Sequence, residues 1–385
     1  MFFAKHSAII GTTGAGKSCA LVIILRSVLA AHPFGHILLL DPHGEYGSAF
    51  PDIADNITPE ALRLPYWLFG FDEIAAVVCS KEVVARSREI LILKEAIVYA
   101  KRDFLGDAGV SAELTVDTPT PYLIDEVVRH ISGEMGRLLK ADTSQPYLRL
   151  MSTIEGLVRD RRYRFMFARD LVHDDMADIL GHILRIPVNG RPITVLDISA
   201  VPSEIVNVVV SLICRLVFDF AVRADRNDTI PIMVACDEAH RYIPRDDAPG
   251  FESARQSIGR IAQEGRKYGV SLCLITQRPS ELSEAVLSQC GTIIALRISN
   301  EEDKKFVRNH LPDAAGGLLN MLPTLGQQEA ILVGEGAVHP MRIRFNDLEE
   351  SYRPRLAPTN FPFAWDKDTK DRTHLKEIIK RWRSR

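Results

Sequence analysis

The chain has 385 residues, of which 46% are hydrophobic and 25% are charged, a balance typical of a globular protein rather than a disordered one. Its 47 Lys and Arg against 50 Asp and Glu give a net charge of −3, so charge alone gives no support to nucleic-acid binding, although it does not exclude it. The apolar runs are shorter than the roughly 18 residues that span a bilayer, which argues against a membrane protein.

The chain opens with a short apolar run at 6–10, the sequence GTTGAGKS, and an Ile/Leu-rich helical pattern at 17–31. The spacing G-x-x-x-x-G-K-S predicts a phosphate-binding loop between a strand and a helix, where glycines let backbone N–H groups point at phosphate oxygens. Lys17 would supply a cation for the β- and γ-phosphates, and Ser18 a hydroxyl for Mg²⁺. The alternative is a glycine turn without a ligand. The nucleotide-binding residues expected here are Gly11, Thr12, Thr13, Gly14, Ala15, Gly16, Lys17, Ser18 and Cys19.

The next apolar run, 36–40, ends in the turn DPHGEYG. This turn lies near the phosphate end of a phosphate-loop fold, so we assign Asp41 and Glu45 to the nucleotide site, in support of the attacking water. The spacing of Asp41, His43 and Glu45 matches no defensible metal set. A turn of mutually satisfied polar groups is the alternative.

Residues 71–190 are mostly helical in pattern and interrupt the alternation of strands and helices. We therefore predict an inserted helical subdomain, flanked by the two parts of one α/β core at 1–70 and 191–350. Further buried strands are predicted at 193–198, 232–236, 270–275, 292–296 and 330–333, and further helices at 204–222, 251–268 and 281–289. The six cysteines are scattered through apolar runs, which favours buried, reduced thiols in a cytoplasmic protein over a zinc site.

Two adjacent carboxylates follow the predicted strand in IMVACDEAHRYIP. Asp237 is placed to hold the Mg²⁺ shell, and Glu238 to orient a water for attack on the γ-phosphate. Alone, the pair could simply mark a helix N-terminus. The strand 270–275 ends at Gln277, whose amide could reach the γ-phosphate or the water, or could merely cap a strand exit. The absence of an N-K-x-D sequence favours ATP over GTP.

Between these strands, the helix 251–268 has one apolar face and several arginines off it. These arginines could simply belong to the solvent-exposed face of an ordinary helix. In an oligomer, however, one of them could enter a neighbour's nucleotide site. The segment 351–385 ends in a basic helix, HLKEIIKRWRSR, which we interpret as a solvated terminal helix, with packing on a neighbouring subunit as the alternative.

Taken together, GTTGAGKS, LLLDPHGEY, LPYWLFGFDE, DEAHRYIP and EGRKYGVSLCLITQRPSELSEAVLSQCGTIIALRISN resemble the HerA family of hexameric ATPases, over about 5–345. The resemblance implies a RecA-like core with an inserted helical bundle, a homo-hexameric ring, ATP with Mg²⁺, and movement of double-stranded DNA. It matches Lys17, Ser18, Asp237, Glu238 and Gln277 to the family's site. It favours Arg266 in EGRKYG as the trans-acting arginine, with Arg260 second.

The family resemblance also implies a partner, either a NurA-like nuclease in DNA repair or an effector in anti-phage defence. Members usually carry a β-barrel before the phosphate loop, whereas ten residues precede Gly11, so we expect a fragment or a shortened member. Two rivals remain. One is an ATP-dependent scaffold that licenses a nuclease or sirtuin-like NADase, and the other is a conjugation-type pump, which would normally carry membrane segments.

Overall fold

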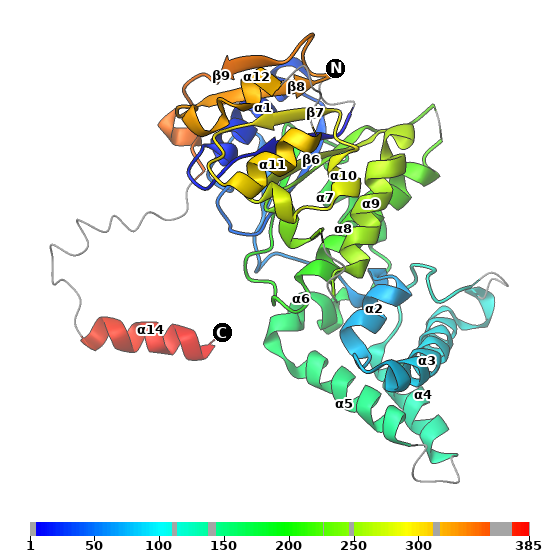
Figure 1. Cartoon of the computed structure of the whole chain (residues 1–385). Helices are drawn as coiled ribbons and strands as arrows, with labels where there is room; N and C mark the ends of the chain where they lie inside the picture. The colour runs from blue at the N-terminus through cyan, green and yellow to red at the C-terminus, as the bar shows by residue number, and fades with distance from the viewer. Residues whose placement is uncertain are drawn as a thin grey trace.

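The structure is a computed structural model that describes residues 5–109, 114–137, 144–225, 227–245, 250–310, 316–354 and 372–384. A nine-stranded sheet forms its centre, in the order β3-β4-β2-β5-β6-β1-β7-β8-β9 (Figure 1). The strands are β1 Ser7–Ile10, β2 His36–Asp41, β3 Ala54–Ile57, β4 Ile193–Asp197, β5 Ile232–Cys236, β6 Val270–Thr276, β7 Thr292–Ala295, β8 Glu329–Gly334 and β9 Met341–Arg344. All pairs from β3 to β7 are parallel, and β8 and β9 add antiparallel pairs at one edge.

The predicted α/β class, a mostly parallel sheet of a RecA-like phosphate-loop fold, is confirmed. Its helices are α1 Lys17–Ala31, α2 Phe71–Val78, α3 Val83–Gly109, α4 Ile124–Gly136, α5 Gln145–Arg159, α6 Arg164–Phe167, α7 Met176–Leu184, α8 Val206–Arg223, α9 Glu252–Glu264, α10 Glu284–Leu287, α11 Glu301–His310, α12 Gly316–Leu319 and α14 Arg372–Ser384. The central strands are buried on both faces, which explains why they lack polar alternation.

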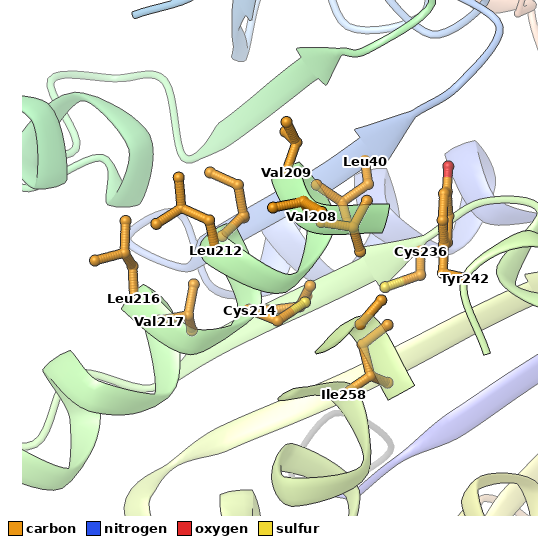
Figure 2. Close-up of a cluster of buried hydrophobic side chains, with 14 of the residues drawn as sticks. Leu40, Val208, Val209, Leu212, Cys214, Leu216, Val217, Cys236, Tyr242 and Ile258 are labelled. Atoms are coloured by element: carbon orange, nitrogen blue, oxygen red, sulfur yellow. The ribbon is translucent and has the colours of Figure 1, made fainter. Parts of the chain in front are cut away.

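Two hydrophobic clusters lie on opposite faces of the sheet, because neighbouring residues of a strand point to opposite sides. Ile9 packs with α1 in one cluster, whereas Ala8 and Ile10 belong to the other. In this second cluster, buried side chains of α8 such as Val208 and Leu212 lie beside the strand residues Leu40 and Cys236 (Figure 2). All six cysteines are free thiols, and all but the half-buried Cys19 are buried.

The described residues between β3 and β4 form helices α2 to α7 and short 3₁₀ turns, and they contain no strand. Helices α3, α4 and α5 pack on one another and project from the sheet layer (Figure 1). The second cluster continues into them, and Trp67 donates a hydrogen bond from Nε1 to the carbonyl of Leu171 at 2.9 Å.

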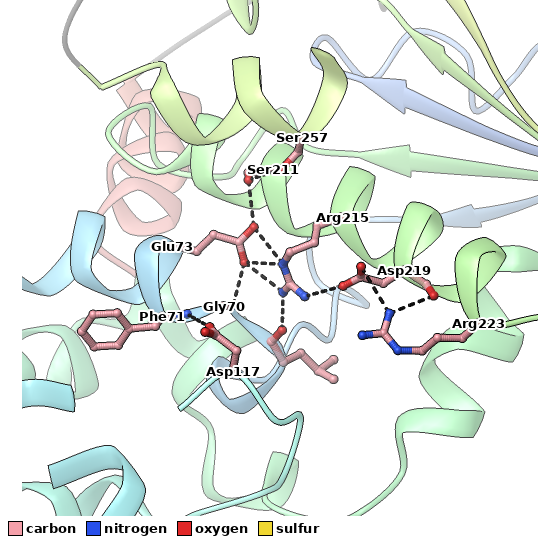
Figure 3. A network of polar contacts seen from close by, with 10 residues as sticks. Gly70, Phe71, Glu73, Asp117, Ser211, Arg215, Asp219, Arg223 and Ser257 are labelled. Carbon is pink, nitrogen blue, oxygen red and sulfur yellow. Dashed lines mark hydrogen bonds and ion pairs between the residues drawn. The ribbon is translucent and has the colours of Figure 1, made fainter. Parts of the chain in front are cut away.

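An ion pair between a buried carboxylate and a half-buried arginine ties this helical segment to the core (Figure 3). Glu73 of α2 accepts from Arg215 of α8 at 3.0 Å and from the hydroxyl of Ser211 at 2.8 Å. Ser211 is in turn within 2.9 Å of Ser257 on α9. Because a buried charge without its partner is costly, this network fixes how α2 sits on α8 and α9.

Three details differ from the sequence-based expectation. The predicted helix 281–289 is reduced to a 3₁₀ turn and α10, because Leu282 is extended and forms a β-bridge with Pro244. The helix predicted over 251–268 ends at Glu264 and continues as a 3₁₀ turn, Gly265–Tyr268. Strands β3 and β9 were not predicted, since ADNI and MRIR carry polar residues typical of sheet edges.

Helix α14 lies apart from the sheet and the other helices in Figure 1, and its Leu375, Ile378 and Trp382 side chains are exposed. Within the described ranges, we find no helix with the length and apolar character that crossing a bilayer requires.

Candidate functional site

The carboxyl ends of β1, β2, β5 and β6 meet at one edge of the sheet, since these four strands are adjacent and parallel. The loop GTTGAGKS leaves β1 at this edge and enters α1. Gly14 and Gly16 have φ of 76° and 98°, which a residue with a side chain rarely adopts. Thr12 is anchored by hydrogen bonds from its N–H and its hydroxyl to the carbonyl of Arg297 at 2.9 and 3.0 Å.

Lys17 is buried at the start of α1, with Nζ 3.3 Å from the carbonyl of Thr12. Burial lowers the pKa of this ammonium group, while Glu238, Asp237 and Glu45 oppose that effect. These three carboxylates come from two other strand ends and surround the lysine. The arrangement is an acidic pocket with a single buried cation at the mouth of a phosphate-binding loop.

Asp237 and Glu238 directly follow β5 and are both buried. Burial raises the pKa of Asp237 to about 8, and the charges of Glu238, Glu45 and Asp41 act in the same direction. Burial also raises the pKa of Glu238, against the opposing charge of Lys17. Glu238 has a left-handed backbone conformation, with φ of 48°, a strained geometry that recurs at functional sites.

Ser18 donates a hydrogen bond to Oε1 of Glu45 at 2.9 Å, so the turn after β2 reaches the phosphate loop. Asp41 lies in the same turn, and its charge also acts on Asp237. Its two carboxylate oxygens accept hydrogen bonds from the N–H groups of His43, Gly44 and Tyr46 at 3.2, 2.8 and 2.9 Å. Asp41 therefore holds the turn that presents Glu45.

The residues fit a nucleotide-bound Mg²⁺ better than a metal held by protein alone. Across the described ranges, no group of three or more His, Cys, Asp or Glu side chains could hold a metal ion. Oε2 of Glu238 and the hydroxyl of Tyr242 are buried without a hydrogen-bond partner in that part of the chain. Mg²⁺ commonly uses one or two protein ligands together with phosphate oxygens and water, and its waters would satisfy such atoms.

Gln277 also lies at this edge, where its side-chain oxygen accepts a hydrogen bond from the hydroxyl of Thr13 in the phosphate loop. A polar cavity of about 1130 Å³ opens beside this pair and is lined by residues such as Thr12, Arg278 and Glu281. The sequence-predicted loop, carboxylates and amide are thus brought together in one place.

Sequence reasoning missed His240 and Thr276. Nδ1 of His240 lies 3.0 Å from Oγ1 of Thr276 and 3.3 Å from Oε2 of Glu238. Oγ1 of Thr276 also accepts from the N–H of Arg278 at 3.1 Å. The ring therefore lies between the tip of β6 and Glu238 without a hydrogen bond to that carboxylate, and burial lowers the pKa of His240 to about 4. Its place in the string DEAH, two residues after Glu238, was the available signal.

The two candidate arginines lie away from the site of their own chain. Arg266 is exposed in the turn before β6, at the opposite end of that strand from Gln277, about 20 Å along the sheet. Arg260 is exposed on α9, and its guanidinium stacks over the ring of Phe218 at 4.5 Å. Neither contributes to its own chain's phosphate loop.

Comparisons with known proteins agree with this geometry. The family described as "Helicase HerA, central domain" matches residues 1–217. The DNA double-strand break repair helicase HerA of Pyrococcus furiosus is 26% identical over 380 residues, covering 90% of this chain and 66% of the relative. The helicase of the same name from Sulfolobus acidocaldarius is 25% identical over 350 residues, covering 90% and 65%. The chain therefore spans about two thirds of the length of these relatives.

Solved structures share the fold at low identity. VirB4 of Thermoanaerobacter pseudethanolicus superposes with a TM-score of 0.63 at 14% identity, covering 90% of both chains. The plasmid coupling protein TrwB in complex with the ATP analogue ADPNP gives a TM-score of 0.57 at 13% identity, covering 92% of this chain and 89% of the other.

Proposed function

The chain belongs to the family of the HerA helicase central domain, and on that premise we propose that it is an ATP-hydrolysing motor that moves double-stranded DNA. One observation carries the catalytic part. Lys17 and Glu238 are far apart in the sequence but interact as opposite charges in a buried site, and Gln277 is hydrogen-bonded to Thr13 of the same phosphate loop. A phosphate loop facing a buried carboxylate and a polar amide is suited to hydrolysing a nucleoside triphosphate.

In this mechanism, the backbone of the phosphate loop and Lys17 bind the phosphates of ATP. Mg²⁺, beside Ser18 and Asp237, supplies charge neutralisation on the phosphate oxygens when it is bound. Glu238 orients a water and accepts its proton, since its Oε2 is buried and has no hydrogen-bond partner in the described residues. Gln277, positioned by Thr13, donates its amide N–H to the γ-phosphate or the water.

The assembly we propose is a homo-hexameric ring in which Arg266 of one subunit completes the nucleotide site of the next. The exposure of Arg266 and its distance from its own phosphate loop support this role. Arg260 is the weaker candidate, because its guanidinium is already stacked on Phe218. Residues 71–190 form the inserted helical subdomain of each subunit in this proposal.

The names of the relatives support DNA as the substrate, since they are called DNA double-strand break repair helicases.

We assign the ring a protein partner, either a NurA-like nuclease that processes DNA ends or an effector in anti-phage defence. The second candidate function is a scaffold, in which the ring assembles and licenses an effector enzyme. The exposed apolar residues of α14, such as Trp382, offer a surface for either kind of assembly.

ATP turnover with and without linear duplex DNA separates a motor from a scaffold. We expect the DNA to raise turnover severalfold in rings verified by mass photometry, and Glu238→Gln to remove both the basal and the stimulated rate. Turnover that duplex DNA leaves unchanged, in rings that still bind an effector, would favour the scaffold. A chain that stays monomeric with ATP and Mg²⁺ at micromolar concentration would contradict both.

A further inference from the structure

A second recess adjoins the phosphate loop on the side away from Gln277. It has a volume of about 260 Å³ and lies between the start of α1 and the segment that follows β9. Gly14, Gly16 and Cys19 form its floor, and Phe345, Asn346 and Arg353 belong to the opposite wall. The phosphate loop is therefore shared between two hollows, this recess and the polar cavity beside Thr13.

The direction of a bound triphosphate follows from which groups face each hollow. Lys17, which binds the β- and γ-phosphates in such loops, is surrounded by the carboxylates of Glu238, Asp237 and Glu45. Thr13 and Gln277 lie at the other cavity. The γ-phosphate end therefore points toward Glu238 and Gln277. The ribose and base must leave the loop past Gly16 and Cys19, which is where the recess begins.

The walls of the recess suit a flat ring with polar edges. Phe345 and Leu348 are half-buried and pack against the apolar cluster around α1. Gln327 and Asn346 are exposed at its rim, and their amides make no hydrogen bond within the described residues. Arg353 donates from Nε to the carbonyl of Leu348 at 3.3 Å, which holds its guanidinium at the mouth.

Gln328 explains how the recess keeps its shape. Its side-chain amide donates to Asp347 at 2.6 Å, and its carbonyl accepts from the N–H of Phe345 at 2.8 Å. These bonds bring the loop before β8 against the segment after β9, with Gln328 held at a positive φ of 66°. Gln328 is therefore a structural residue, and Gln327 and Asn346 are left to meet a ligand.

The polar groups at the rim can pair with the edge of a purine. No carboxylate lines the recess among the described residues, so the N–H and amino groups of a guanine edge meet no anionic acceptor. A side-chain amide pairs well with adenine, by accepting from its amino group and donating to the adjacent ring nitrogen.

We propose that this recess binds the adenine base of the nucleotide, with Phe345 and Leu348 against the ring, and with Asn346 and Gln327 as the residues that select adenine over guanine. The inference rests on the proposed function, because it requires a triphosphate in the loop GTTGAGKS. It assigns a base-binding role to the segment after β9, far in sequence from the phosphate loop.

The test is calorimetric titration of the full chain with ATP, GTP and inorganic tripolyphosphate, all in the Glu238→Gln background so that the nucleotides stay intact. Asn346→Ala and Gln327→Ala should each weaken ATP binding by roughly threefold to tenfold, the worth of one hydrogen bond. Both should narrow the preference for ATP over GTP and leave tripolyphosphate binding unchanged. Gln289→Ala is the matched control, because it removes an exposed amide just before β7, at the opposite end of the strands from the phosphate loop.

Unchanged tripolyphosphate binding shows that each variant is folded and its phosphate loop intact. If the double variant Asn346→Ala/Gln327→Ala keeps the ATP affinity and the ATP/GTP ratio within twofold of the parent, the base does not lie in this recess. The proposed function itself is overturned if the parent chain binds neither ATP nor tripolyphosphate. It is also overturned if Lys17→Ala leaves the affinity for both ligands unchanged. The two failures are therefore distinct.

Discussion

The hydroxyl of Thr13 donates a hydrogen bond to the side-chain oxygen of Gln277, which joins the phosphate loop to the tip of β6 across 264 residues of sequence. The bond orients the amide of Gln277, because an oxygen that accepts from Thr13 leaves the N–H₂ group to face the cavity beside the loop. The phosphate loop thus sets which end of the amide a bound γ-phosphate would meet.

Gln277→Ala should slow ATP hydrolysis at least about tenfold and change ATP affinity little, since a donor aimed at developing charge acts mainly in the transition state. Steady-state kinetics measure this as a fall in kcat. Thr13→Val should cause a smaller fall, because it removes the hydroxyl at nearly constant volume, while Thr13→Ser should keep the parental rate. Equal rates for the Val and Ser variants would show that the hydrogen bond has no catalytic consequence.

Glu238→Gln should abolish turnover and preserve nucleotide binding, whereas Lys17→Ala should abolish turnover by weakening binding of the phosphates. Loss of a general base usually costs 10²–10⁴-fold, so residual activity of Glu238→Gln is expected well below about one tenth of the parent. Turnover together with calorimetry separates the two effects. More than a tenth of the rate in Glu238→Gln would remove Glu238 from the water-activating role.

Arg266→Ala should form rings and bind ATP normally but hydrolyse it poorly, because an arginine that completes a neighbouring site can contribute 10³–10⁵-fold. The measurement mixes Arg266→Ala with Glu238→Gln subunits. Some interfaces of a mixed ring pair an intact Glu238 with an intact Arg266 of the neighbour, so part of the activity should return. Arg260→Ala serves as a control and should chiefly disturb packing on Phe218.

No recovery in rings shown to be mixed would contradict the trans assignment of Arg266. If Arg260→Ala then showed complementation in the same assay, Arg260 would take its place.

The strand ends were predictable from sequence because polar functional residues come directly after an apolar run, as with the loop GTTGAGKS after β1 and Asp237 after β5. What the sequence could not reveal depends on contacts between distant segments. Asp41 was assigned to the site because it follows an apolar run, but the sequence could not show that its oxygens accept hydrogen bonds from the backbone N–H groups of its own turn. The role of His240 required knowing that Thr276 lies 3.0 Å away on the adjacent strand.

The same limit applies to the recess beside Cys19. Its far wall comes from the segment after β9, a strand whose MRIR sequence gives only a weak signal. Pairing of β8 with β9 brings that wall to the phosphate loop, and this pairing is a property of the folded chain rather than of any local pattern.

Asp237 should make the stability of the free chain fall as pH rises from about 6 to 8. The folded carboxyl keeps its proton to about pH 8, while the same group in an unfolded chain loses it near its ordinary value of 3.8. Between these values folding takes up a proton, so the free energy of unfolding decreases with pH. In Asp237→Asn this contribution, about 1 to 2 kcal/mol over that range, should disappear. Urea unfolding with a chelator present measures it.

An equal pH dependence in Asp237→Asn and the parent would mean that Asp237 is ionised throughout this range. Added Mg²⁺ with an ATP analogue should flatten the parental profile as well, because the ionised carboxylate is then the stabilised form.

The most direct test of the central claim is displacement of a third strand from duplex DNA, which requires movement along the duplex rather than mere binding. Full-length rings should release the third strand with ATP and Mg²⁺, and both Glu238→Gln and replacement of ATP by a non-hydrolysable analogue should abolish this release. Steady ATP hydrolysis in the presence of this DNA, with the third strand left in place, would contradict a duplex-translocating motor.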